Sequence, residues 1–473
     1  MITIDALLAS EDALSRLGQA LDGSQEFWTM YLQNQSSGYT ELILLRDWQG
    51  RFHLGVPRNK SLSKPEKKEL EKQVSALEKT IRPLAHEAFV FYSDDLVDAD
   101  AIWKQAEGTP FQWMDGDIPK PPPQGVHVRL IERQVKEKTW VQQPDVSSVQ
   151  ASKVQRAVMF GIKGGVGRSS SLLALAWHLG NQGKKVLVLD ADFESPGIST
   201  SMLENDLSPD YGLLDWFAAN ALEPTLANEL ITNELIVTRS SLDQLYTHHR
   251  QGTILVAPAF GRKTQDYVGK LGRLYQDTLS PDGIITHYAG RFLELIQVLE
   301  THHQPDVVLI DSRAGIDDTA AVVLTQLNAY AFLFATSGRQ TWEAYKLLFK
   351  HWQRYADLTE GGEDFRERLK VVSALTPEDS AAPGNFTHLC EESYELFLAH
   401  LYEAQAPGIA NGFNFEFSDT EAPHWPLRIR WNEALRNFDP LKYPTQLDPA
   451  LFDSAFGDFV KSISVSLETP ENE

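Results

Sequence analysis

The stretch GIKGGVGRSSS runs from Gly161 to Ser171 and decides how the surrounding sequence folds. It follows a short apolar run, AVMF (157–160), and precedes a segment whose apolar spacing predicts a helix ending near Gly183. Because glycine has no Cβ atom, such a loop can wrap closely around an anion and aim its N–H groups inward. The helix N-terminus adds a partial positive charge. The pattern therefore predicts a phosphate-binding loop.

This loop departs at two positions from the usual pattern G-x-x-x-x-G-K-[ST]. Ile162 replaces the first glycine, and Arg168 replaces the lysine. Arg168 keeps the positive charge, but its planar guanidinium binds phosphate as a fork and not as a point charge. A lysine stands earlier in the loop, at Lys163. The loop alone is compatible with an unusual nucleotide site, a decayed one or a coincidence.

Short apolar runs alternate with helical patterns from Arg156 onward. Continuous runs rich in β-branched residues are typical of strands that are buried on both faces. The alternation predicts an α/β fold with a doubly wound, mostly parallel sheet. The predicted strands are AVMF (157–160), KVLVLD (185–190), TILVAP (253–258), DVVLID (306–311), AYAFLFAT (329–336) and LKVVSAL (369–375).

The rest of the chain predicts further parts around this α/β domain. Residues 1–120 mix helical and strand patterns and predict a small α+β module of unknown role. Residues 121–155 form a proline-rich linker and lead-in, and residues 156–380 form the α/β domain. Residues 381–473 predict a C-terminal helical extension that packs on this domain. Its last segment carries apolar residues at helical spacing: Phe452, Phe456, Phe459, Val460 and Ile463.

Composition limits the functions that the chain can have. Lys plus Arg is 43 against 65 for Asp plus Glu, and the formal net charge of −22 argues against DNA and anionic membranes as partners. The one cysteine, Cys390, cannot form an intrachain disulfide or a cysteine-based metal cluster. The N-terminus is acidic, unlike a signal or transit peptide, and no apolar run is long enough to span a bilayer. We therefore expect a cytoplasmic protein.

Three motifs together resemble a known family. KGGVGRSS (163–170) is similar to the deviant Walker A signature K-G-G-x-G-[KR]-[ST]-[ST] of the MinD/ParA group of P-loop ATPases, in a variant with arginine. KKVLVLDADFESPGIS resembles the group's second motif, a strand ending in D-x-D at Asp190 and Asp192. PDVVLIDSRAGIDD resembles its Walker B motif, in which Asp311 and Gly315 match.

The resemblance implies that the chain binds ATP and Mg²⁺. Lys163 would reach across a homodimer interface to the phosphates of the partner subunit, and Arg168 would contact the β- and γ-phosphates of its own subunit. Ser169 would bind Mg²⁺, Asp311 would hold a water on that ion, and Asp190 would support the metal shell. Asp192 would position or activate the attacking water. The predicted catalytic residues are Lys163, Asp192 and Arg168.

The nucleotide itself would be held by the loop and by two further places. Gly315 would sense the γ-phosphate through its backbone N–H, and adenine would lie near Thr376 and Pro377. Arg313 replaces the usual proline of the third motif. Either an ion pair with Asp317 or Asp318 or a phosphate contact would explain it. The predicted phosphate-binding residues are Gly164, Gly165, Val166, Gly167, Arg168, Ser169 and Ser170.

The relatives of such a fold do different work. Paired cysteines, a tyrosine-rich tail and a basic amphipathic tail are absent, which argues against cluster carriers, tyrosine kinases and membrane cycling. The leading hypothesis is an ATP-dependent dimerisation switch that recruits a protein partner through the N-terminal module or the C-terminal helices, in a setting such as bacterial anti-phage defence. The alternatives are a dimeric scaffold that binds nucleotide without hydrolysis, and a ParA-type partition ATPase that binds DNA.

Two histidine doublets, His248–His249 and His302–His303, look like metal ligands at first sight. Neighbouring residues on a helix point apart, and no carboxylate or cysteine set surrounds the doublets in the sequence. We expect both doublets to be solvated surface residues.

Overall fold

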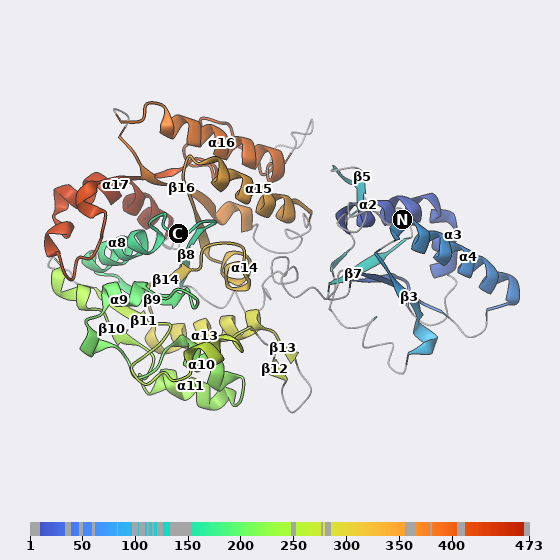
Figure 1. Cartoon of the computed structure of the whole chain (residues 1–473), viewed down its shortest axis with the longest axis horizontal. Helices are drawn as coiled ribbons and strands as arrows, with labels where there is room; N and C mark the ends of the chain where they lie inside the picture. Colours follow the sequence, from blue (N-terminus) through green and yellow to red (C-terminus); the bar gives the residue numbers. More distant parts are fainter. Residues whose placement is uncertain are drawn as a thin grey trace, which may run out of the picture. The chain divides into compact units, whose positions relative to one another are not determined.

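Figure 1 shows the computed structural model of the chain, which forms two compact units, Met1–Lys138 and Thr139–Glu473. The boundary between the two units, after Lys138, lies within the predicted linker, 121–155. The described residues are 10–33, 39–46, 51–58, 62–82, 84–96, 103, 109–110, 113–115, 118–120, 126–132, 154–246, 252–275, 278–279, 285–354, 365–378, 381–403 and 412–467.

The first unit is a small α+β body in which helices pack on a mixed sheet of order β3-β2-β1-β7-β4. Strands β1 and β2 pair antiparallel, and the side chains of Leu70, Val74, Leu77 and Ile81, which are spaced as on one face of a helix, are buried. The elements are α2 (Ser10–Gly23), α3 (Gln25–Gln33), β1 (Leu42–Arg46), β2 (Phe52–Val56), α4 (Lys64–Ile81), β3 (Ala85–Tyr92), β4 (Thr109–Pro110), β5 (Trp113–Asp115), β6 (Ile118–Lys120) and β7 (Val128–Glu132).

The second unit contains a sheet of order β10-β11-β9-β14-β8-β15-β16-β17, in which only β10 runs antiparallel to its neighbour. All six predicted strands are present, so the expected doubly wound, mostly parallel sheet is confirmed. Its strands are β8 (Gln155–Gly161), β9 (Lys185–Ala191), β10 (Thr238–Arg239), β11 (Thr253–Ala257), β14 (Val307–Ser312), β15 (Tyr330–Ala335), β16 (Leu369–Thr376) and β17 (Leu427–Arg430). A separate hairpin joins β12 (Thr278–Leu279) to β13 (Ile285–Thr286).

Both faces of this sheet are buried, because successive side chains of a strand point to opposite faces. In β8, Ala157 and Met159 join one apolar cluster, while Val158 and Phe160 join the other. Helices cover both clusters, which explains the continuous apolar runs of the sequence. The cluster with Ala157 and Met159 is covered by α8 (Arg168–Asn181) and α9 (Ile198–Met202). The cluster with Val158 and Phe160 is covered by α10 (Leu213–Asn220), α11 (Pro224–Thr232), α12 (Tyr267–Leu271), α13 (Tyr288–His303), α14 (Asp318–Thr325), α15 (Arg339–Arg354) and α16 (Asn385–His400).

The C-terminal part contributes helix α17 (Pro449–Ser466) and one strand to the second unit. The predicted apolar stripe of α17 is buried, and Phe452 packs against Trp177 of α8 with ring centroids 5.1 Å apart. Strand β17 was not predicted, because LRIR is too short and too polar to stand out in the sequence. Within the described residues, none of the helices combines the length and apolar character needed to cross a membrane.

Candidate functional site

The predicted motifs meet at the carboxyl edge of the large sheet. Strand β14 lies between β9 and β8, and β8 lies between β14 and β15. Since all these strands are parallel, the loops that follow them emerge at the same edge. The chain places strands on both sides of β8, and such switch points are where open α/β sheets bind their ligands.

The glycine-rich loop between β8 and α8 has the backbone of an anion cradle. Gly165 and Gly167 have φ angles of 74° and 81°, the left-handed region that glycine adopts without strain. A Cβ atom at Gly164 or Gly165 would meet no atom within 4 Å, so the loop faces open space there. Val166 is 7% exposed and packs into the core, so only its backbone can face a ligand.

A serine and two aspartates lie together beneath this loop. Ser169 Oγ donates a hydrogen bond to Asp311 Oδ2 at 2.7 Å. Asp311 and Asp190 are direct neighbours across β14 and β9. Each aspartate has a buried Oδ1 atom that lacks a hydrogen-bond partner among the described residues. Unsatisfied buried carboxylate oxygens beside a hydroxyl form the oxygen-rich donor set that Mg²⁺ prefers, so these residues fit the ion.

Both aspartates have raised pKa values in the absence of a cation. Burial, and then the charge of Asp311, raises the pKa of Asp190 to about 8. Burial also raises the pKa of Asp311 to about 6, against the opposing hydrogen bond from Ser169. A bound dication would reverse this penalty by stabilising both carboxylates.

Arg168 and Asp192 contact each other at the same edge. The Arg168 side chain is 8% exposed, and its Nη1 atom donates to the backbone carbonyl of Ser312 at the end of β14. Its Nη2 atom lies 3.8 Å from Asp192 Oδ2, while Asp192 Oδ1 accepts a bond from the backbone N–H of Ser195 at 3.2 Å. Burial raises the pKa of Asp192, and the Arg168 charge lowers it. Arg168 therefore has protein partners where a phosphate contact was predicted.

Lys163 extends from the loop toward helix α15, where its ammonium donates to the side-chain carbonyl of Gln340. Gly315, which follows β14, has a φ of 97°, and its N–H donates to the Gly161 carbonyl at 3.0 Å. A γ-phosphate contact through this N–H would require that bond to open. Such an exchange can couple ligand binding to a loop movement.

Glu194 was missed by the sequence reasoning, although it belongs to the quoted stretch DFESPG. Its Oε1 atom lies 2.8 Å from Arg313 Nη1 and accepts a hydrogen bond from Tyr275 Oη at 2.6 Å. Arg313 Nε is also 3.8 Å from Asp317 Oδ2. Of the two interpretations of Arg313, the ion pair with Asp317 is therefore present, with Glu194 as a nearer partner.

The end of β16 lies beside the glycine loop, and the hydroxyl of one predicted adenine-binding residue, Thr376, contacts a neighbour within the strand. Thr376 is 2% exposed, and its hydroxyl lies 2.6 Å from that of Ser373. Leu375 has a φ of 50°, which is unusual for a bulky residue, and its Cδ2 atom lies 3.5 Å from the Cβ position of Gly167. Half-buried Pro377 follows the strand. Leu375, which sequence reasoning missed, is a residue of this segment whose side chain lies close to the loop.

This fold and this loop define a P-loop type of nucleotide-binding domain. Residues 157–331 match the family described as the CobQ/CobB/MinD/ParA nucleotide binding domain. This part of the chain is therefore a nucleotide-binding domain of the MinD/ParA type. No curated protein matches the chain.

Several solved structures resemble the chain in fold. A ParA family ATPase from Chlorobium tepidum has 14% identity and a TM-score of 0.37, over 65% of this chain and 98% of its own. The ParA protein of pNOB8 has 15% identity and a TM-score of 0.40, over 67% and 100%. A plasmid partition protein from Borrelia burgdorferi, bound to AMPPNP, has 17% identity and a TM-score of 0.34, over 67% and 99%.

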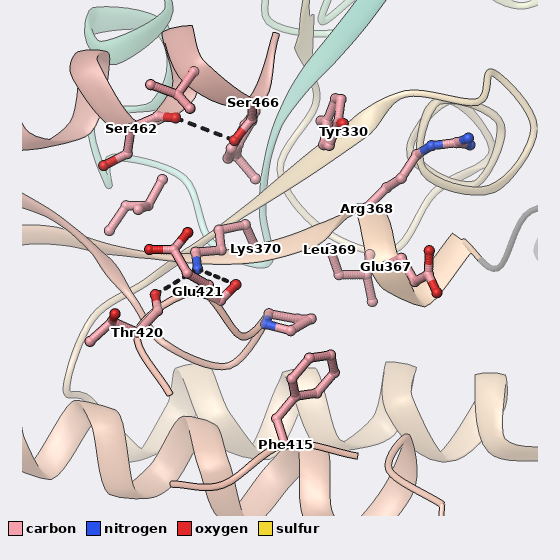
Figure 2. A pocket seen from close by; sticks show the side chains of 14 residues that line it. Tyr330, Glu367, Arg368, Leu369, Lys370, Phe415, Thr420, Glu421, Ser462 and Ser466 are labelled. Atoms are coloured by element: carbon pink, nitrogen blue, oxygen red, sulfur yellow. Dashed lines mark hydrogen bonds between the residues drawn. The ribbon is translucent and has the colours of Figure 1, made fainter. Parts of the chain in front are cut away.

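A separate cavity of about 490 Å³ opens at the other edge of the sheet, where β15 and β16 begin (Figure 2). Lys370 lies in its wall, and its ammonium donates to the carbonyls of Thr420, Glu421 and Ala422 at 2.8–3.2 Å. Burial lowers the pKa of Lys370 to about 8. These three hydrogen bonds fix the Lys370 ammonium to the loop that precedes β17. The predicted nucleotide site is separate from this cavity, because it lies at the carboxyl edge of the sheet.

Proposed function

We propose that this protein is a Mg²⁺-dependent ATPase in which ATP drives the formation of a homodimer through the nucleotide face. The observation that carries the proposal is the group of half-buried Ser169 and buried Asp190 and Asp311 below an open glycine loop. Phosphoryl transfer depends on charge neutralisation and on an oriented water. These three residues would hold the Mg²⁺ ion that neutralises the charge of the phosphates. Asp192, at the end of the neighbouring strand, would orient the water.

Lys163 would act between two subunits. It stands beside the two glycines that face open space, and its present partner is a neutral amide of Gln340. An ammonium group is attracted more strongly to the phosphates of a bound nucleotide than to an amide oxygen. The proposal is therefore that ATP in a second subunit draws Lys163 away from Gln340 and closes the dimer.

The test is the size of the chain in solution, measured by light scattering coupled to gel filtration, with ATP, ADP or no nucleotide. We expect the wild type to double its mass with ATP and Mg²⁺ alone. Lys163→Ala should stay monomeric while still binding nucleotide. Lys346→Ala removes an exposed lysine from helix α15 and serves as the matched control, which should behave as the wild type. An ATP-independent size of the wild type would refute the switch.

A second candidate function is a constitutive scaffold that binds nucleotide without hydrolysing it. The observation in its favour is that both oxygens of Asp192 have partners, with Arg168 near one and the Ser195 N–H on the other. A carboxylate held in this way cannot easily orient a water. The scaffold would owe its tight binding to the buried guanidinium of Arg168.

Phosphate release separates the two candidates. If the chain is an ATPase, Asp192→Ala should abolish turnover, while Asp453→Ala, which alters an exposed aspartate of α17, should leave it unchanged. If the wild type releases no phosphate above background but binds ATP, the scaffold is supported and the enzyme is refuted.

The dimer would act on a protein partner through the N-terminal module or the C-terminal helices. The net charge of −22 supports a protein as the partner over DNA. Fluorescence anisotropy with a non-specific DNA duplex tests this choice, since salt-sensitive binding that requires ATP would support the ParA-type alternative instead. The anti-phage setting can be tested by plating phages on cells that carry the wild type or Lys163→Ala.

A further inference from the structure

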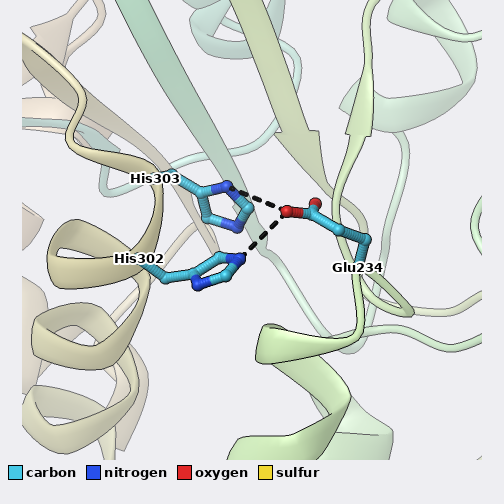
Figure 3. A group of neighbouring side chains, drawn as sticks. All are labelled: Glu234, His302 and His303. Atoms are coloured by element: carbon cyan, nitrogen blue, oxygen red, sulfur yellow. Dashed lines mark hydrogen bonds and ion pairs between the residues drawn. The ribbon is translucent and has the colours of Figure 1, made fainter.

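Three side chains that bind metals elsewhere in proteins lie together at the end of helix α13 (Figure 3). His302 and His303 are its last two residues, and Glu234 follows helix α11. One possible ligand atom from each residue lies within 4.8 Å of the other two. His302 Nε2 is 2.9 Å from Glu234 Oε1, and His303 Nδ1 is 4.0 Å from the same oxygen.

The expectation that this doublet is solvated surface is wrong for His303, whose side chain is 5% exposed. The two imidazole centroids are only 4.7 Å apart at the helix end, and a carboxylate from a distant segment faces both rings. The sequence could not show this carboxylate, because Glu234 is separated from the doublet by many residues. The other doublet, His248–His249, lies outside the described residues.

The backbone around this group favours a cation. Helix α11 ends at Thr232 and helix α13 at His303, so the negative ends of two helix dipoles lie near the cluster. Each helix ends with a residue in the left-handed region, Glu234 with a φ of 57° and Gln304 with a φ of 45°. Glycine or asparagine usually takes this position. The residue at this position is instead a glutamate, whose carboxylate lies beside the two imidazoles.

One atom of the cluster lacks a partner. His303 Nδ1 is the ring nitrogen 4.0 Å from Glu234 Oε1, while the other ring nitrogen, Nε2, is buried and has no hydrogen-bond partner among the described residues. The ammonium of Lys185 donates to the backbone carbonyl of His303. This charge disfavours cations that are held by charge alone, so a metal bound here must be one that forms bonds to imidazole nitrogen.

We propose that Glu234, His302 and His303 form a Zn²⁺ site with two imidazoles, one carboxylate and a water as ligands. In a tetrahedral zinc site, neighbouring ligand atoms are about 3.3 Å apart, as follows from zinc–ligand bonds of about 2.0–2.1 Å. The distances from Glu234 Oε1 to the two imidazoles, 2.9 and 4.0 Å, lie on either side of this value. Small rotations of two partly exposed side chains would complete the site.

The zinc site would act as a clip within the second unit. It would join the connection between α11 and β10 to the end of α13, just before β14 begins at Val307. The predicted nucleotide residues lie at the opposite, carboxyl end of β14. The clip is therefore independent of the proposed ATPase, and it would stabilise the α11 segment whether or not nucleotide is bound.

The experiment is calorimetric titration of the untagged, chelator-treated full chain with ZnCl₂, without nucleotide. We expect one Zn²⁺ per chain with micromolar or tighter affinity, and a rise in melting temperature on zinc addition. Glu234→Gln and His302→Ala should weaken binding at least tenfold and abolish that rise. Both residues are partly exposed, so these variants should fold even if His303→Ala does not. Cobalt bound in place of zinc should show the absorption of a tetrahedral ion.

A matched control comes from helix α16, where exposed His388 lies 3.7 and 3.5 Å from the carboxylates of Glu391 and Glu392. His388→Ala should leave zinc binding unchanged. The proposal is overturned if the wild type binds no zinc in a one-to-one ratio. It is also overturned if binding persists in Glu234→Gln and His302→Ala, or if only His388→Ala removes it.

Discussion

Replacement of Asp190 by asparagine should stabilise the metal-free protein and remove the response to Mg²⁺ and nucleotide that the proposed function requires. Asp190 is fully buried, its Oδ1 atom lacks a hydrogen-bond partner among the described residues, and Asp311 is its direct neighbour. Its pKa rises from 3.8 to about 8 on folding. Asparagine keeps an oxygen for the hydrogen bond from Ser199, which Asp190 now accepts at 3.0 Å. Its amide group can also donate to Asp311.

The magnitude follows from the linkage between proton binding and folding. Because the pKa is raised in the folded state, the folded chain binds more protons than the unfolded chain between pH 4 and pH 8. The contribution of Asp190 to stability therefore falls as the pH rises through this window. At pH 7, about three units above the unfolded value, the cost is up to about 4 kcal/mol, at about 1.4 kcal/mol per unit. Asp190→Asn should recover this energy and raise the melting temperature by roughly 5–10 °C.

The assay is scanning calorimetry of the full chain in chelator, at pH 4, 7 and 8. The variant should match the wild type at pH 4 and exceed it at pH 7 and 8. With Mg²⁺ and ATP the order should reverse, because only the wild type gains binding energy. Asp215→Asn is the control, since Asp215 is also buried but is paired with Lys270, so that variant should lose stability. A variant at position 190 that melts below the metal-free wild type at pH 7 would refute the reasoning.

Three further predictions concern the same unit. Arg156→Ala should cost about 3–5 kcal/mol in urea unfolding, because it leaves Glu300 buried without the guanidinium that now contacts it at 2.6 Å; a loss below about 1 kcal/mol would contradict this. Burial raises the pKa of Asp317 to about 6, so its contribution to stability falls from about pH 4 to pH 6. Asp317→Asn should therefore add up to about 3 kcal/mol above pH 6 and nothing at pH 4, and an equal gain at both pH values would contradict the assignment. Gly315→Ala should cost about 1–2 kcal/mol, because alanine is strained at a φ of 97°; unchanged unfolding would show that the loop relaxes freely.

Much of the fold could be predicted from the sequence because it depends on local patterns. A strand buried on both faces needs a continuous apolar run, so β8, β9 and β14 are visible in the sequence. The glycine loop is visible because only glycine adopts the left-handed backbone of Gly165 and Gly167 without strain. Strand β17 was missed, because LRIR becomes a strand only when it pairs with β16.

The sequence by itself determined the α/β fold, the glycine loop and the order of the acidic motifs, since these depend on residue type and spacing. Only the tertiary structure decided which groups meet. In the folded chain, Arg168 contacts Ser312 and Asp192, and Arg313 forms an ion pair with Glu194. The tertiary structure also brought Glu234 to the two histidines of α13. These contacts join segments that are far apart in the chain, and the packing of helices on the sheet fixes them, which no local pattern encodes.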